Sequence, residues 1–116
     1  MKPVRVELDG KERTLKYDFN AMSDFEELMG MGVGAAFQGG QVGFRTIRAL
    51  YWAGLRHKEK GLTLERTGKM LSNEVSNGRN LEELMEYVEK AIEASGLMPK
   101  GAEEDEDSNE DDEAKN

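Results

Sequence analysis

Side chains that could carry out catalysis are few in this chain. His57 is the only histidine and there is no cysteine, so a thiolate nucleophile, a disulfide and the usual histidine- or cysteine-based metal site are excluded by composition. Glu26-Glu27 and Glu82-Glu83 pair carboxylates, but both pairs fall in expected first turns of helices, where offsetting the helix dipole is the simpler role. The same reasoning gives His57 a dipole-complementing role at a helix C-terminus. We therefore expect a protein that is not an enzyme and that uses no cofactor or metal.

The glycine-rich stretch from residue 30 to 43 is a weak candidate for phosphate binding. It contains six glycines and opens with Gly-Met-Gly-Val-Gly, but it follows an expected helix rather than a strand, and it lacks the Gly-Lys-Ser/Thr ending of a phosphate loop. We interpret it as a mobile connection from which Val33 or Phe37 docks on the core. Met31, beside this connection, has a soft side chain suited to an interface and is a candidate for contact with a partner.

Arginine and tryptophan side chains form the best candidate for a protein-binding surface. Arg48, Trp52 and Arg56 recur at i, i+4 and i+8, a spacing that predicts an indole between two guanidinium groups along one edge of a helix, with Arg45 close by. Tryptophan and arginine are the residue types that most often anchor protein interfaces. We therefore interpret Arg45, Arg48, Trp52 and Arg56 as protein-binding residues, with the alternative that Trp52 only forms the rim of the core.

The basic middle of the chain also raises the possibility of DNA binding. Residues 42–79 contain eight basic and three acidic side chains, in what could be a helix-turn-helix. However, the expected break between the helices is four or five residues long, and the short second helix holds Gly68 in its middle. An acidic tail would also oppose contact with phosphates. Nucleic-acid binding is therefore disfavoured.

The elements that must position these residues begin with a hairpin. Apolar and charged residues alternate on both sides of Asp9-Gly10, a pair that favours a two-residue turn. The predicted register places Leu8 opposite Lys11 and Val4 opposite Leu15. Because an isolated hairpin is only marginally stable in water, its apolar face must pack on helices.

Four helices are expected after the hairpin, and the one over residues 42–57 is central. Its apolar face is broad, so the helix needs neighbours on several sides; this face comprises Phe44, Ile47, Leu50, Tyr51, Gly54 and Leu55. The other helices are expected at 21–29 with Asn20 as the N-cap, at 64–71 with Thr63 as the N-cap, and at 81–95, starting after Asn80 and ending at Gly96. Residues 72–79 are rich in Asn, Ser and Gly and are expected to form a loop.

The charge of the chain is concentrated at its end. Of the 24 acidic and 16 basic residues, nine acidic residues and one lysine lie at 102–116, which leaves 15 of each sign before them. Residues 100–116 hold no large apolar side chain and are expected to be disordered. The sequence thus predicts an α+β, mainly helical domain at 1–99, built from an N-terminal β-hairpin and about four helices, followed by a disordered acidic C-terminal tail. No segment has the apolar length of a membrane span.

Three stretches of the chain resemble a known family. Residues 6–30 read Val-Glu-Leu-Asp-Gly-Lys-Glu-Arg-Thr-Leu-Lys-Tyr-Asp-Phe-Asn-Ala-Met-Ser-Asp-Phe-Glu-Glu-Leu-Met-Gly, residues 48–55 read Arg-Ala-Leu-Tyr-Trp-Ala-Gly-Leu, and residues 62–65 read Leu-Thr-Leu-Glu. In order and kind they are similar to the tail assembly chaperones of phages with long non-contractile tails, including related prophage and gene-transfer-agent tail proteins. The resemblance covers about residues 4 to 95 and includes no catalytic motif.

The resemblance implies a non-enzymatic assembly factor. Such a protein binds the tape measure protein, keeps it soluble and helps to recruit tail tube subunits; it acts in the host cell cytoplasm and is absent from the mature virion. In many phages a ribosomal frameshift yields a longer form, so that the acidic tail would belong to the short form. Self-association is compatible with this role. The alternatives are a small DNA-binding or DNA-mimicking regulator and a structural head-tail component of the virion.

Overall fold

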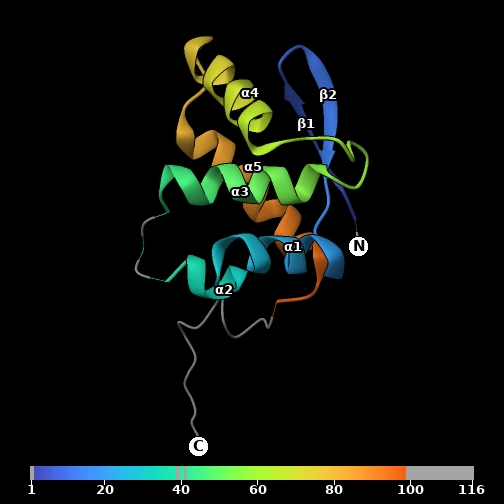
Figure 1. The fold of residues 1–116 in the computed structure, drawn as a ribbon. Coiled ribbons are helices and arrows are strands. Elements are labelled where there is room, and N and C mark those ends of the chain that lie inside the picture. Colours follow the sequence, from blue (N-terminus) through green and yellow to red (C-terminus); the bar gives the residue numbers. More distant parts are fainter. Residues whose placement is uncertain (1, 39, 41, 99–116) are drawn as a thin grey trace, which may run out of the picture.

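The computed structural model describes residues 2–38, 40 and 42–98, and in these ranges a two-stranded hairpin is followed by helices (Figure 1). The elements are β1 (Val4–Leu8), β2 (Lys11–Leu15), α1 (Phe19–Met29), α2 (Val33–Ala36), α3 (Phe44–Leu55), α4 (Leu64–Ser76) and α5 (Leu81–Ser95). The predicted class, α+β and mainly helical with an N-terminal hairpin, is confirmed. The acidic tail at 100–116 and the domain end at residue 99 lie outside the described residues.

The hairpin has the register that its sequence predicts. The strands are antiparallel, with Leu8 opposite Lys11 and Val4 opposite Leu15. Asp9 and Gly10 both have positive φ, at 55° and 78°, as a two-residue turn of this kind requires. The inner face of the hairpin is buried against the helices, so the strands gain the packing that an isolated hairpin lacks.

Helix α3 lies at the centre of the molecule. It contacts α1, α4, α5 and β2, and in Figure 1 it runs between α1 on one side and α4 with the hairpin on the other, with α5 behind it. Seven of its residues are buried: Ile47, Ala49, Leu50, Tyr51, Ala53, Gly54 and Leu55. The prediction that the other elements surround this helix is confirmed. The placement of Phe44 in the core is wrong, because this first residue of α3 extends beyond the covering helices and is 76% exposed.

The contact between the hairpin and α3 depends on Gly54. A Cβ at this position would lie 2.8 Å from the ring of Tyr17 and 2.9 Å from Cδ2 of Leu15. The backbone of the hairpin end also bonds here, since the amide of Lys16 donates to the carbonyl of Gly54 at 2.9 Å. The hydroxyl of Tyr17 donates to the carbonyl of Leu50, one turn earlier in α3, at 2.6 Å. The hairpin and α3 therefore approach each other more closely than two side-chain-bearing surfaces could.

The helix ends agree only partly with the sequence prediction. Helix α5 is capped by the side chain of Asn80 and ends at Gly96 in the left-handed conformation, as predicted. Helix α1, however, begins at Phe19 with Asp18 as its N-cap, so the assignment of Asn20 as the cap is wrong. The Asp18 carboxylate accepts from the amide of Ala21 at 2.9 Å and satisfies a free N–H of the first turn. Asn20 lies inside the first turn and does not cap it. The assignment of Glu26-Glu27 to a first turn is also wrong, because the first turn of α1 holds no acidic residue.

Helix α4 is longer than the sequence predicts. It continues to Ser76, whereas the composition indicates a loop from residue 72. The hairpin turn stabilises this extra length: Glu74 accepts from the amide of Asp9 at 2.6 Å, and the Asn73 side chain donates to the Asp9 carboxylate at 3.0 Å. These contacts join residues more than sixty positions apart, so local composition could not indicate them.

The glycine-rich stretch holds a short helix that the sequence did not predict. Helix α2 occupies four residues of it, from Val33 to Ala36. Val33 is buried and Phe37 is partly buried against the core, which confirms that this stretch docks on the domain. Residues 39 and 41 lie outside the described residues.

The packing at Gly54 gives a direct stability prediction. Gly54→Ala should lower the free energy of unfolding by roughly 1–3 kcal/mol, because the new methyl group overlaps the Tyr17 ring in a packed core. Gly61→Ala is the matched control, since no atom lies within 4 Å of the place that its new methyl group would take and its φ is not in the left-handed region; it should change stability by less than about 0.5 kcal/mol. Urea unfolding followed by circular dichroism measures both. Equal midpoints for the two variants would contradict this account of the contact between the hairpin and α3.

Candidate protein-binding site

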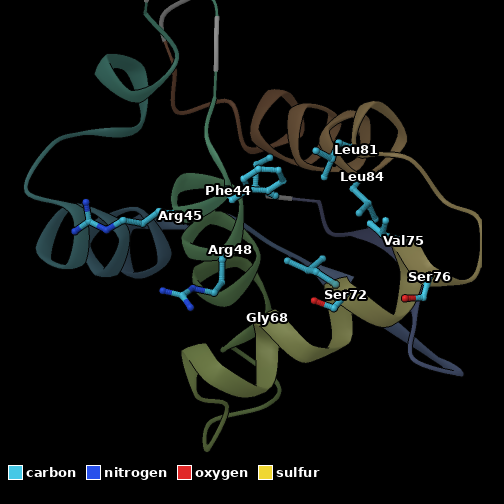
Figure 2. A pocket seen from close by; sticks show the side chains of 11 residues that line it. Phe44, Arg45, Arg48, Gly68, Ser72, Val75, Ser76, Leu81 and Leu84 are labelled. Carbon is cyan, nitrogen blue, oxygen red and sulfur yellow. The ribbon is translucent and has the colours of Figure 1, made fainter.

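A groove of about 640 Å³ lies between α3, α4 and α5. Its apolar lining comes from all three helices, with Phe44 and Ile47 from α3, Leu71 and Val75 from α4, and Leu81 and Leu84 from α5. In Figure 2 the side chains of Phe44, Val75, Leu81 and Leu84 point toward one another around this space. The volume is within the range of sites that bind ligands or partner side chains.

The rim of the groove is unusually apolar for an exposed surface. Phe44 is 76% exposed, Val75 47% and Leu81 37%. Among the described residues only two other large apolar side chains are exposed, Phe19 and Met31, and neither lines the groove. A cluster of exposed apolar side chains around a concave surface is typical of a site for a protein partner.

Two arginines give one side of the groove a positive charge. Arg45 and Arg48 project from α3 and line the groove, and in Figure 2 both side chains extend away from the apolar cluster, so that their guanidinium groups lie at the α3 edge. None of the described residues that line the groove is acidic. Nε of Arg48 is buried and has no hydrogen-bond partner in the described part of the chain. This side of the groove therefore offers an unneutralised positive charge to a partner.

Trp52 and Arg56 contribute to the packing of the domain and do not line the groove. The indole N–H of Trp52 donates to the carbonyl of Leu62 at 3.0 Å. The guanidinium of Arg56 lies 4.8 Å from the centre of the Trp52 ring and pairs with the carboxylate of Asp24 at 2.7 Å. The predicted stack of the indole between two guanidinium groups is wrong, because Arg48 turns toward α4 instead.

Met31 is exposed, as its position beside the glycine-rich stretch suggested, but it does not line the groove. The structure therefore brings together Arg45 and Arg48 out of the five residues proposed from the sequence, and it places Trp52, Arg56 and Met31 elsewhere. The sequence reasoning missed Phe44, Val75 and Leu81 as surface residues. Phe44 and Leu81 are the first residues of α3 and α5. An apolar side chain at the start of a helix can lie past the neighbouring elements that bury the rest of its apolar face, and this position was the signal available in the sequence.

His57 links the C-terminal end of α3 to the hairpin. Its Nδ1 lies 3.0 Å from the carbonyl oxygen of Gly54 and its Nε2 lies 3.1 Å from the hydroxyl of Thr14. A carbonyl can only accept, so Nδ1 carries the proton of the neutral ring and Nε2 accepts from Thr14. Burial lowers the pKa of His57 below its ordinary value of 6.5, and the nearby Lys16 and Lys58 lower it further. His57 therefore acts as a neutral hydrogen-bonding link and not as the positive charge expected at the helix end.

Comparisons with models of known protein families, with curated proteins and with solved structures find no match. Within the described part of the chain, no three His, Cys, Asp or Glu side chains come close enough to hold a metal ion. None of the helices in that part has the length and apolar character needed to cross a membrane. A function must therefore be inferred from the groove and from the residues that surround it.

The lowered pKa of His57 predicts how stability changes with pH. The unfolded chain, with an ordinary histidine pKa near 6.5, binds more protons than the folded protein, so the free energy of unfolding should decrease as the pH falls below about 6.5. His57→Gln should remove this decrease between about pH 7.5 and 5.5, above the range in which carboxylates titrate. Because His57 is the only histidine, NMR titration of its ring reports the pKa directly. A folded-state pKa above 6.5 would contradict the prediction.

Proposed function

We propose that this protein is a phage tail assembly chaperone that binds the tape measure protein and helps to recruit tail tube subunits. The observation that carries the proposal is the groove, where Phe44, Val75 and Leu81 expose apolar surface around a concave site. The sequence resemblance across residues 4 to 95 supplies the class of partner. The site of action is the cytoplasm of the host cell, and the protein leaves before the virion is complete.

The groove suits this role for a physical reason. A tape measure protein is long and helical, and its apolar surfaces must be covered until the tail tube surrounds them. A groove formed by three helices can accept the apolar face of a partner helix. Partly exposed apolar side chains around such a groove allow reversible binding, since the chaperone must later be released.

Ion pairs within the protein favour a protein partner over DNA. Several basic residues between 42 and 79 are engaged internally: Arg56 pairs with Asp24, and Arg79 pairs with Glu74 and Glu83. Arg66, on α4, lies 3.6 Å from the carboxylate of Asp9. A DNA-binding surface would need these charges free to neutralise phosphates.

The other alternative is a structural head-tail component of the virion. Such a component would be found by mass spectrometry of purified particles, whereas an assembly chaperone would be absent from them.

The proposal predicts that Phe44 is needed for partner binding but not for folding. When the protein is co-expressed with its tape measure protein, wild type should keep the partner soluble and co-purify with it. Phe44→Ser should reduce the co-purified amount at least about fivefold, because it removes apolar area that only a partner buries. Its thermal stability should stay close to that of wild type, since exposed side chains contribute little to the core.

Phe19→Ser is the matched control for that experiment. Phe19 is 74% exposed, almost the same as Phe44, but it lies on α1 and outside the groove. This variant should keep the partner soluble. Equal loss of the partner in both variants, or in neither, would argue against the groove as the binding surface. Recovery of the protein from purified particles in amounts comparable to tube subunits would indicate a structural component instead.

A further inference from the structure

We propose that the groove binds one amphipathic α-helix of a partner protein, and that a carboxylate on this helix pairs with Arg48. The inference rests on the proposed function only for the identity of the natural partner. The chemistry of the occupant follows from the groove itself: apolar residues on one face of the helix contact Phe44, Val75 and Leu81, and an acidic residue at the edge of that face meets the arginine side.

The walls of the groove favour a helix over an extended peptide. They consist of side chains on α3, α4 and α5, and outside the first and last turns the backbone groups of these helices are paired within the helix. An extended segment would leave its own N–H and C=O groups unpaired against such walls, whereas a helix satisfies them internally. The hairpin, which could have accepted an added strand, does not line the groove. Apolar residues spaced at i, i+3 or i+4, and i+7 would fill a groove of this kind.

The charge of the lining selects an acidic partner. Arg45 and Arg48 are its charged residues, and no salt bridge joins either of them to another residue of the described part of the chain. A carboxylate matches the planar fork of a guanidinium and can accept two hydrogen bonds from it. A basic helix would instead place like charges together.

Gly68 explains how Arg48 reaches this position. A Cβ on Gly68 would lie 3.3 Å from Cδ of Arg48, closer than most side-chain contacts. The glycine in the middle of α4 therefore leaves room for the aliphatic part of the Arg48 side chain to pack against α4. Glycine is unfavourable inside a helix, and this contact gives a physical reason for its presence. Gly68 acts here as a positioning residue for Arg48.

The acidic segment at 102–116 of the same chain does not have the right composition for this groove. It could pair with arginine, but it contains no large apolar side chain with which to cover Phe44, Val75 and Leu81. A second copy of the chain is the other possible occupant. Both are distinguished from a partner helix by the experiment below.

The test measures binding of three labelled helical peptides to the full chain by fluorescence anisotropy. The peptides share one apolar face and carry Glu, Gln or Lys at the flanking edge. We expect the Glu peptide to bind roughly tenfold more tightly than the Gln peptide, the effect of one charge-assisted hydrogen bond, and the Lys peptide to bind most weakly. The preference for Glu should fall to less than about twofold in Arg48→Gln. It should persist in Lys90→Gln, a control on an exposed part of α5 outside the groove.

Further measurements separate loss of peptide binding from misfolding, and separate a partner helix from the two other occupants of the groove. Gly68→Ala should weaken the Glu preference by shifting Arg48, and circular dichroism of each variant should match wild type. Equal affinity for the Glu and Gln peptides, or a Glu preference retained in Arg48→Gln, would overturn the inference. It would also be overturned if Phe44→Ser converted a dimeric wild type into a monomer in analytical ultracentrifugation, or if removal of residues 102–116 were required before any peptide bound.

The inference and the proposed function can fail separately. If the Glu peptide binds through Arg48 but the tape measure protein is not retained, the acidic-helix site stands and the chaperone assignment fails. If the tape measure protein is retained equally by wild type and by Arg48→Gln, the chaperone assignment stands and the inference fails. Both stand only if the tape measure protein also loses affinity in Arg48→Gln.

Discussion

The close approach of the hairpin to α3 at Gly54 is the constraint on which the rest of the structure depends. A two-stranded hairpin has too little buried surface to persist alone, so its folding requires a helix surface within reach of both Tyr17 and Leu15. Gly54 provides that surface, and its carbonyl is contacted by the amide of Lys16 and by the ring of His57. These contacts fix both the position and the rotation of α3. The rotation in turn determines which of its residues face the groove.

Helix α3 consequently carries different interactions on its different sides. One side meets the hairpin at Gly54, and a second is joined to α1 by the contact of Arg56 with Asp24. Tyr51 donates to the carbonyl of Leu84 at 2.7 Å and thereby holds α5 behind α3. The remaining side, near the start of the helix, is left open by the other described elements and forms one wall of the groove with Phe44 and Arg48. The binding surface is thus the part of the central helix that these elements leave uncovered.

Local features of the chain were predictable from sequence, whereas the groove was not. The hairpin register follows from Asp9-Gly10 and the alternation beside it, and the ends of α5 follow from Asn80 and Gly96, because each signal acts within a few residues. The extension of α4 depends instead on contacts with the distant hairpin turn. Likewise, periodicity assigns Phe44 to the apolar face of its helix, but only the arrangement of α4 and α5 decides whether anything covers that face.

The charges around the groove also determine how an acidic helix must lie in it. Glu82, beside Leu81 at the start of α5, is exposed, and the exposed Glu86 and Glu89 continue this acidic surface along the helix. The side of the groove near α5 would therefore repel a carboxylate, while the side near α3 attracts one through Arg45 and Arg48. With its apolar face held by Phe44, Val75 and Leu81, a partner helix can place its acidic edge favourably only over α3. The positive charge on the α3 wall and the carboxylates that lie beyond the α5 wall thus fix the rotation of the bound helix about its own axis, a constraint that apolar contacts alone would not impose.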